Sequence, residues 1–531
     1  MTAGRTIKEL NTRFLFPFFF HRHSVLEAAI LLEAATFAGV APGWMRAGRP
    51  GLYTDEMLEH VAGHLFPKEL SSGGGGYLHL AETAANKVFR SLSVSVREGR
   101  ALPVSLSWAG GVELFLSPQG VGLLSVTLQP GEKALETEAA IDFNYSIARR
   151  HGDMTARFRM SHPQDDAGRW SHVPEESRSK IGPIPADDAP FEGRIARPGG
   201  TFTLSELANA LLAPIVGLAV PPGDEKAANA KSRRIGIQEG FSVYTVALFG
   251  TEVDFDDSEC RLALAPVLSS LAQVEEASHA GHSSVGDSIP AVVLNRKHWA
   301  ASGQLATAHL IADQPVRDSG KEPPFNLQRM GRIRDKYFAT YAAAYLQRLA
   351  LQRAMHDAVA IIGAGGTPGT EAAMAFAALR SDLLDFAVLG HFTQVSGRQA
   401  VHRTYQLALE GMDVARSWED VRRAVADIDA RNAAHAQEAM TKGMARSLTQ
   451  GVQLQKAVHL IEIFLVTVYS AHLSQMLLEE LKPIVKGHEP WEHTFHLASP
   501  FLVIGAALAG FLATRAFVHR HDSDAKAEEK S

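Results

Sequence analysis

Carboxylates and imidazoles are unusually dense in a short polar segment near the carboxyl end of this chain. Carboxylate oxygens suit hard divalent cations, and imidazole nitrogens suit zinc, nickel or cobalt. His493 and His496 would share a face if the segment were helical, because residues three apart on a helix are neighbours. The segment is therefore either a site that gathers divalent cations or a solvated loop whose charges keep it out of lipid. The candidate metal ligands are His488, Glu489, Glu492, His493 and His496.

Two apolar segments flank this polar one, at Leu460–Leu478 and Leu497–Val518. Each is about as long as the ~20 residues that a helix needs to cross ~30 Å of hydrocarbon. The second segment also contains two overlapping pairs of small residues four positions apart, which let a neighbouring helix pack closely. These pairs consist of Gly505, Ala506, Ala509 and Gly510. Together the two segments predict a membrane hairpin.

Basic residues near both ends of the hairpin predict its orientation. Lys442, Arg446 and Lys456 precede the first segment, and Arg515, Arg520 and Lys526 follow the second. Because the cytoplasmic flanks of membrane helices are enriched in Lys and Arg, we expect both termini in the cytoplasm and the hairpin in the inner (plasma) membrane. Residues 479–496 would then form an outer loop, and residues 519–531 a cytoplasmic tail.

Glu462 and His472 are ionisable residues inside the first apolar segment. Such residues are costly in a bilayer and tend to face a bundle interior or water. They are separated by nearly three helical turns, so they can share a face. One interpretation is a pore-lining or gating position, a second is that Glu462 marks the cytoplasmic interface, and a third is that the segment is an apolar core helix. Further pore candidates are Thr467, Ser470, Asn432, Thr441 and Met444, although helix polarity alone cannot choose the face.

The composition restricts the remaining function classes. The 531 residues carry a net charge of -6 with 21% charged residues, so there is no basic footprint for nucleic acid. The single cysteine, Cys260, rules out an internal disulfide framework and a cysteine-based metal cluster. The chain lacks a phosphate-binding loop, a nucleophile elbow and a kinase signature. We therefore expect no enzyme and no cofactor, apart from magnesium or another divalent cation as a transported or regulatory ion.

Residues 1–324 mix strand and helix patterns and predict an α/β domain. Val112–Leu116 and Val121–Leu128 surround a Pro-Gly turn and predict a hairpin. The phenylalanine-rich run Phe14–Phe20 predicts a buried strand. Further along, Thr203–Leu212 and Ser258–Ala277 predict helices, and Phe241–Phe249 and Ala291–Leu294 predict strands. Residues 161–200 are rich in Pro, Asp, Ser and Arg, so we expect a mobile insertion there.

After Pro324 the pattern becomes helical throughout. Residues 325–416 predict a helical region, and Ser417 is a plausible N-cap for the next helix, with Asp420 in the capping-box position. No proline occurs from Trp418 to Lys482. One stalk helix at 417–478 is therefore expected to continue into the first membrane span. The expected fold is an α+β cytoplasmic domain, a long helical stalk and two carboxyl-terminal transmembrane helices.

Basic residues also cluster at the start of the helical half. Arg329, Arg332, Arg334 and Lys336 fall within eight positions. Such a group can hold a phosphate-bearing ligand or an anionic lipid. It can equally be a solvated helix face paired with acidic neighbours.

This order of elements resembles the CorA-type magnesium transporter family, most closely from Phe325 to Arg520. The hallmark of that family is a Gly-Met-Asn triplet at the outer end of the first span. The matching stretch here, Leu477–Pro483, reads Leu-Leu-Glu-Glu-Leu-Lys-Pro. The resemblance is thus to the architecture, as in a divergent member that lacks the motif.

The resemblance implies a homopentamer in the lipid bilayer, with long helices around a central axis and cytoplasmic domains that form a funnel. It implies permeation of a divalent cation or another ion. An alternative is a membrane effector of the kind used in bacterial defence, gated by a small nucleotide bound to the cytoplasmic domain. Another is a membrane-anchored sensor or scaffold without transport, and the last is a soluble helical protein whose final helices form its core.

Overall fold

The computed structural model divides the chain into two compact units, Met1–Ile428 and Asp429–Ser531. It describes residues 6–22, 24–37, 39–46, 55–67, 74–89, 92–95, 101–105, 111–131, 134–149, 155–160, 171–172, 201–218, 241–250, 252–276, 289–313, 325–363, 370–485 and 489–528. The insertion expected at 161–200 lies outside these residues, apart from 171–172.

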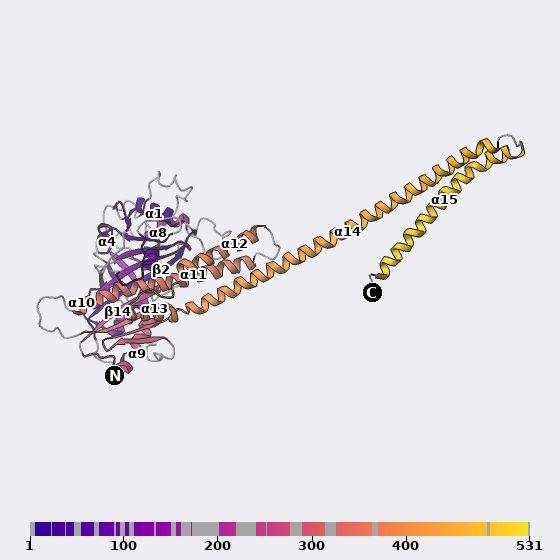
Figure 1. Ribbon diagram of the computed structural model, residues 1–531. Helices are drawn as coiled ribbons and strands as arrows, with labels where there is room; N and C mark the ends of the chain where they lie inside the picture. The colour runs from indigo at the N-terminus through magenta and orange to yellow at the C-terminus, as the bar shows by residue number, and fades with distance from the viewer. Residues whose placement is uncertain are drawn as a thin grey trace. The chain divides into compact units, whose positions relative to one another are not determined.

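A thirteen-stranded mixed sheet forms the centre of the first unit (Figure 1). Its strands are β2 (Glu9–Phe19), β4 (Trp44–Arg46), β5 (Gly76–Leu80), β6 (Leu92–Ser95), β7 (Ala101–Ser105), β8 (Val112–Ser117), β9 (Val121–Pro130), β11 (Arg157–Met160), β13 (Thr201–Phe202), β14 (Ser242–Phe249), β15 (Ala291–Asn295), β16 (His298–Ser302) and β17 (Ala306–Ala312). The main path runs β13-β11-β6-β7-β9-β2-β14-β17-β16-β15, and a branch runs from β9 through β8 and β5 to β4. Only the β14–β17 pair among the described strands is parallel.

Two small two-stranded sheets complete the strand inventory of the described residues. One pairs β1 (Thr6–Ile7) with β10 (Leu135–Glu136), and the other pairs β3 (Thr36–Phe37) with β12 (Ser171–His172).

The helices of the first unit pack on both faces of the large sheet. They are α1 (Val25–Ala34), α3 (Glu59–Leu65), α4 (Glu82–Phe89), α5 (Thr137–Ala148), α8 (Leu204–Leu212), the 3-10 helix η2 (Ala213–Leu218), α9 (Ser258–Gln273), α10 (Phe325–Arg332), the π-helical turn η5 (Ile333–Tyr337), α11 (Phe338–Gly363), α12 (Thr370–Asp385), the π-helical turn η6 (Phe386–Gly390) and α13 (Gln399–Gly411). Two longer helices follow, α14 (Val414–Val485) and α15 (Glu489–Glu528).

Alternation along the strands divides the interior into two cores, because successive side chains point to opposite faces of a sheet. In β2, Phe14, Phe16 and Phe18 belong to the core that also contains residues of α1, α4, α5, α8 and α9. Leu15 and Phe19 belong to the other core, which contains residues of α3, α11 and α13. A strand buried on both faces reads as a nearly continuous apolar run, which explains the phenylalanine-rich sequence of β2.

Most predicted elements of the first unit are confirmed. The phenylalanine-rich run lies in β2, and the predicted hairpin is β8 and β9, with Ser117 opposite Val121. Thr203 caps α8 through a capping box with Glu206. The predicted strands at 241–249 and 291–294 are β14 and β15.

Two predicted helix ends are wrong. The helix expected at Ser258–Ala277 ends at Gln273, because Val274 adopts a left-handed conformation with φ 58° and stops the helix. The long helix begins at Val414, so Ser417 is not its N-cap. Asp413 is left-handed, with φ 54°, and turns the chain directly from α13 into α14, while the Ser417 hydroxyl donates to the Asp413 carbonyl at 3.0 Å.

Most residues of the predicted outer loop at 479–496 are helical. α14 continues to Val485, and α15 begins at Glu489, which leaves 486–488 outside the described residues. Glu, Leu and Lys at 479–482 are strong helix formers. Pro490 falls in the first turn of α15, where a missing N–H costs little.

We expect Gly122→Ala to lower the thermal unfolding midpoint of the protein by several degrees. Gly122 in β9 lies directly against the ring of Phe18, so a Cβ at this position would overlap a buried side chain that has no room to move. Gly331→Ala in α10 is the matched control. No atom lies within 4 Å of the added Cβ there, so the change should raise the midpoint slightly. Equal effects of the two substitutions would contradict the packing described for β2 and β9.

Candidate functional site

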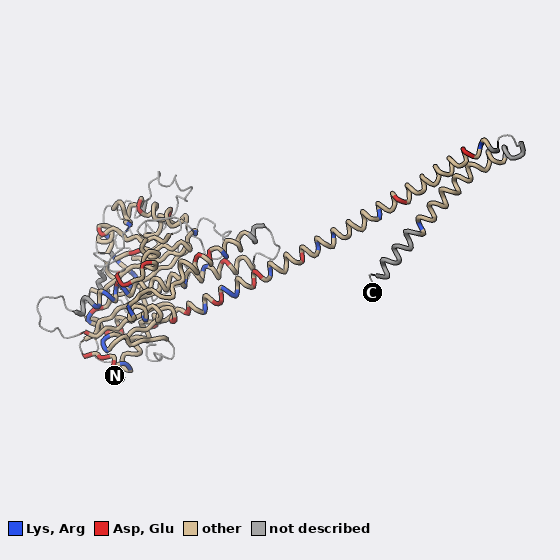
Figure 2. Tube along the Cα trace, viewed as in Figure 1, with Lys and Arg blue, Asp and Glu red and all other residues tan. Residues whose placement is uncertain are grey.

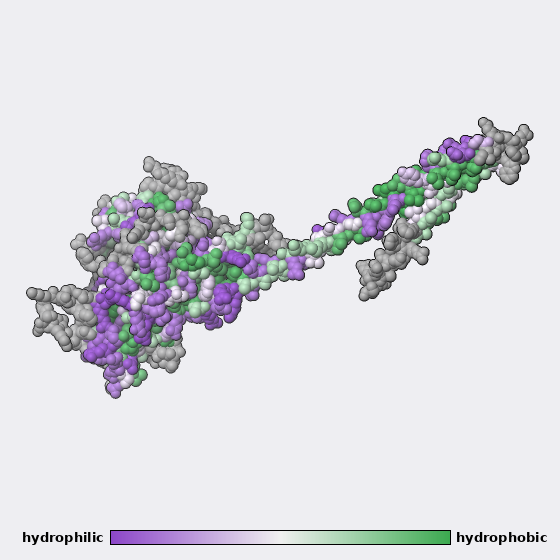
Figure 3. Space-filling view, viewed as in Figure 1, coloured by the Kyte–Doolittle hydropathy of each residue, from purple (hydrophilic) through white to green (hydrophobic). Residues whose placement is uncertain are grey.

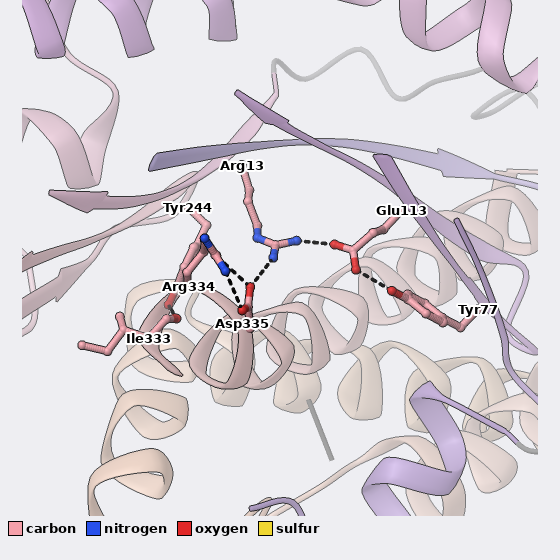
Figure 4. A network of polar contacts seen from close by, with 7 residues as sticks. All are labelled: Arg13, Tyr77, Glu113, Tyr244, Ile333, Arg334 and Asp335. Carbon is pink, nitrogen blue, oxygen red and sulfur yellow. Dashed lines mark hydrogen bonds and ion pairs between the residues drawn. The ribbon is translucent and has the colours of Figure 1, made fainter. Parts of the chain in front are cut away.

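A row of buried polar side chains crosses one face of the large sheet beneath the η5 turn. Arg13 of β2, Glu113 of β8 and Tyr244 of β14 all lie on the face that carries α11 and α13. Asp335 of η5 is also buried, with 1% of its surface exposed. The network they form joins three strands to the π-helical turn (Figure 4).

Arg13 is the centre of this network. Its guanidinium donates to the Glu113 carboxylate through Nη1 and to Asp335 Oδ1 through Nη2, at 3.0 Å for the second contact. The guanidinium carbon also lies 4.1 Å from the centre of the Phe338 ring. Glu113 accepts a further hydrogen bond from the Tyr77 hydroxyl. A buried charge is tolerated only when it is paired and hydrogen-bonded, and Arg13 meets both conditions.

The same network fixes the backbone of η5. The Tyr244 hydroxyl donates to the Ile333 carbonyl at 2.6 Å, and burial raises the pKa of that hydroxyl well above its usual value. Arg334 donates to Asp335 through Nε at 3.1 Å and through Nη2 at 3.0 Å. π-helical turns inside α-helices often occur at functional sites. The polar row therefore holds an irregular helical segment in a defined position.

A pair of histidines continues the row toward the sheet edge. His298 Nε2 of β16 lies 3.0 Å from His309 Nδ1 of β17, and both side chains are buried. The ring of Tyr337 in η5 stacks on His298 at 6.0 Å between ring centres. Burial lowers the pKa of His309 to about 3, and it lowers the pKa of His298 well below its usual value, helped by His309 and Arg329. Both imidazoles are thus neutral at physiological pH.

The structure separates the three arginines predicted to hold a ligand. Arg334 points into the network and pairs with Asp335. Arg332 lies 3.5 Å from the Glu56 carboxylate, and its side chain is 52% exposed. Arg329 donates to the side-chain oxygen of Asn295. Only Arg329 and Arg332 of the predicted set are therefore available near the surface.

In the second unit, α14 and α15 form an antiparallel apolar hairpin. Each helix has an 18-residue window that is long and apolar enough to cross a membrane, with mean hydropathy 1.4 in α14 and 1.9 in α15. A helix from the core of a soluble protein would be mostly buried, whereas neither window is buried within the described residues. Figure 2 shows few charged residues along the paired helices, and Figure 3 shows their apolar surface.

One side of α14 packs on α15. Gly510 of α15 lies against Ser470, so that a Cβ added at Gly510 would be 2.7 Å from the Ser470 hydroxyl oxygen. Thr467 is half-buried on the same side, and its hydroxyl donates to the Ile463 carbonyl at 2.7 Å. The two predicted small-residue pairs differ in their surroundings. The pair Ala506 and Gly510 is half-buried toward α14. The pair Gly505 and Ala509 is exposed, and a Cβ added at Gly505 would meet open space.

The other side of α14 carries the ionisable pore candidates. Glu462 is 64% exposed and lies 3.3 Å from His459 one turn earlier, and His472 is exposed as well. Tyr469 lies between them, also exposed, at 69%. Thr467 and Ser470 thus face the second helix, whereas Glu462 and His472 face away from it.

The three remaining candidates lie earlier on α14 and are all exposed. Met444 precedes Glu462 by about five full turns and therefore occupies the same face of the helix. Thr441 lies close to that face, and its hydroxyl donates to the Gln437 carbonyl at 2.8 Å. Asn432 falls on a different face by the same helical periodicity.

The predicted metal ligands fall at the turn of the hairpin. His488 lies outside the described residues. Glu489, Glu492, His493 and His496 occupy the first turns of α15, and their spacing places all four positions on one helical face. Nothing is described of these four side chains, and no cluster of three or more metal-binding side chains occurs among those that the structure describes.

Comparison with known proteins identifies no relative of the chain, because no family model, no curated protein and no solved structure matches it. The class defined so far is a protein with an α+β domain followed by two helices that are apolar enough to span a membrane, the first of which is the long helix α14. The CorA-type resemblance is carried by the order of these elements alone.

The polar row was not foreseen from the sequence, although it left a signal. Arg13 directly precedes the phenylalanine-rich run of β2, and Glu113 lies within the apolar pattern of β8. Charged residues are almost never fully buried unless they are paired. Each charged residue therefore indicated that a buried partner exists. The partners could not be identified from the sequence, because Glu113 and Asp335 lie 100 and 322 residues after Arg13.

We expect Glu113→Gln to destabilise the first unit strongly, by about 3–5 kcal/mol, because it removes one partner of a buried ion pair. The surface substitution Glu419→Gln is the control. Glu419 pairs with Arg422 and Arg423 at 3.5 and 3.4 Å, but all three side chains are exposed, so the loss should be at most about 1 kcal/mol. Thermal unfolding of the wild type and the two variants measures the loss of unfolding free energy caused by each substitution. Similar losses would show that the network does not anchor η5.

The histidine pair predicts a loss of stability on acidification. In the unfolded chain each imidazole binds a proton near pH 6.5, whereas His309 in the folded protein does so only near pH 3. The unfolded state therefore binds more protons between these values, and stability falls as the pH is lowered through this window. The expected slope is about 1.4 kcal/mol per pH unit for each histidine.

Thermal unfolding between pH 7.5 and 5 measures this slope. A variant with His298→Gln and His309→Gln should show a shallower pH dependence than the wild type. An unchanged slope in the double variant would assign the acid sensitivity to other groups.

Proposed function

We propose that this is a two-span protein of the inner (plasma) membrane that assembles with copies of itself and allows ions to cross beside α14. The observation that carries the proposal is the one-sided packing of α14. α15 covers the face with Thr467 and Ser470 and leaves Glu462 and His472 uncovered. Ionisable residues in a span usually face water or a bundle interior. An oligomer built around the uncovered face would give them that environment.

The open small-residue pair on α15 supports self-association. Gly505 and Ala509 are not used for packing against α14, and small residues on an exposed membrane helix allow close approach of another helix. The exposed stalk face is also apolar, at Met440, Met444 and Leu448. A homopentamer, as implied by the CorA-type resemblance, would bring these surfaces together. Both termini would lie in the cytoplasm.

Divalent cations are the ions that we propose for this path, and magnesium is one candidate. Glu462 supplies a carboxylate, and the first turns of α15 add Glu489 and Glu492 on one face with His493 and His496. Repetition of these charges around a symmetry axis would raise the local concentration of cations.

A second candidate function is a membrane effector gated by a ligand. It is favoured by the exposed basic side chains of the first unit, including Arg332 and Arg398, whose exposed fractions are 52% and 61%. In this alternative the hairpin conducts only after the ligand binds. A sensor or scaffold anchored by the hairpin, without transport, is the third.

Ion flux into liposomes that contain the purified full-length protein tests the proposal. Divalent cation flux should fall at least about fivefold in Glu462→Gln, because removal of the carboxylate lowers the local cation concentration. His472→Ala should also alter flux or selectivity. Thr467→Ala is the matched control on the face covered by α15 and should leave flux close to the wild-type value.

Chemical cross-linking in the same liposomes establishes that inserted oligomers are present. Inserted oligomers that conduct no ion, with or without added nucleotide, would overturn ion permeation and leave the anchored sensor. Equal losses in Glu462→Gln and Thr467→Ala would contradict the proposed pore face.

A further inference from the structure

A buried carboxylate gathers three basic side chains at the surface end of η5. The Glu56 side chain is only 3% exposed, and its Oε1 atom lies 2.9 Å from Arg398 Nη1, 3.2 Å from Lys336 Nζ and 3.5 Å from Arg332 Nε. Lys336 also lies 3.7 Å from Asp55. Residues from three separate segments of the chain therefore meet at one point.

These segments are held rigidly. The Ser396 hydroxyl donates to the Glu56 carbonyl, the Leu58 N–H donates to the Val395 carbonyl at 2.9 Å, and the Arg398 N–H donates to the Ser396 hydroxyl oxygen at 3.1 Å. The third segment is η5, which the Arg13 network anchors to the sheet. The basic groups thus start from fixed backbone positions, which reduces the entropy lost when they bind a ligand.

The cluster has an excess of positive charge. Arg332, Lys336 and Arg398 supply three positive charges, and Asp55 and Glu56 supply two negative charges, so the excess is one. A surface network that served only to neutralise its own charges would not require this excess.

The two most exposed members, Arg332 and Arg398, also keep guanidinium nitrogens that no acidic group within the described part of the chain is shown to pair with. A guanidinium group has five N–H donors in a planar fork, and Glu56 lies within ion-pairing distance of one nitrogen each of Arg332 and Arg398. More than half of each side chain is exposed. Such forks match the oxygens of a phosphate group in a two-pronged arrangement.

We infer that Arg332, Lys336 and Arg398 form a binding site for a phosphate-bearing small molecule, with Glu56 as the anion that pairs with the basic groups when no ligand is bound. Arg334 is not part of this site, because its guanidinium is paired with the buried Asp335. The site lies wholly within the first unit, so the inference does not depend on whether the hairpin conducts ions.

Equilibrium binding of pyrophosphate to the full-length protein in detergent tests this inference. The double variant Arg332→Gln, Arg398→Gln should bind pyrophosphate at least about tenfold more weakly, because two charged hydrogen-bond donors are lost. Its unfolding midpoint should fall no further than that of Glu56→Gln, because the buried Glu56 carboxylate keeps its ion pair with Lys336. The control Arg416→Gln, Arg422→Gln removes the same charge from exposed positions of α14 and should leave binding unchanged.

Glu56→Gln distinguishes a ligand site from a purely structural cluster. Loss of the carboxylate should lower the unfolding midpoint, yet strengthen pyrophosphate binding several-fold, because the basic groups lose their competing anion. A structural cluster would show the loss of stability alone, and that outcome would overturn the inference.

Two further arms complete the experiment. ATP and a short-chain phosphatidate in place of pyrophosphate identify whether the phosphate belongs to a soluble molecule or to a lipid headgroup, and tight binding of either supports the site. No saturable binding of any of the three at millimolar concentration, or equal binding by both arginine double variants, would overturn it.

Discussion

The architecture of the first unit depends on the burial of one positive charge. Arg13 has no exposed surface, and it lies in a central strand of the sheet that is buried on both faces. Its charge is compatible with this position only because Glu113 and Asp335 are brought to it from other elements. Since Asp335 belongs to η5, the pairing also decides where the helical half of the unit meets the sheet. The ion pairs therefore specify the position of η5.

A consequence of this constraint is that the sheet face beneath η5 carries charged and ionisable side chains. Alternation along β2, β14 and β17 places Arg13, Tyr244 and His309 on this face, while the opposite face is mainly apolar, with an uncharged polar cluster of Thr12, Asn144 and Thr245. Low dielectric strengthens every electrostatic interaction along the polar row. The row ends near the surface, where Tyr337 links the buried histidines to the basic cluster around Glu56. Structural anchoring and a candidate ligand site thus share one short π-helical turn.

A different constraint governs the second unit. The two apolar helices contact each other where Gly510 of α15 packs on Ser470 of α14. That contact gives α14 a covered face with small hydroxyl residues and an uncovered face with Glu462 and His472. The covered Thr467 hydroxyl donates a hydrogen bond to the Ile463 carbonyl of its own helix, as a hydroxyl in an apolar environment requires. The uncovered ionisable groups are the ones that require another partner, which motivates the proposed assembly.

The sequence by itself determined the elements whose signal is local. Two β-rich runs around a turn specified the β8–β9 hairpin, and apolar residues at helical spacing specified the long α14 helix and the two membrane-length segments. The end of α9 at Gln273 and the start of α14 at Val414 depend on Val274 and Asp413, which adopt the left-handed conformation. Neither residue is a glycine, so the sequence did not indicate these positions. Only the tertiary structure decided which charges meet, because Arg13 and Asp335, or Glu56 and Arg398, are hundreds of residues apart. Likewise, helix polarity could not choose between Glu462 and Ser470, since that choice depends on where a second helix packs.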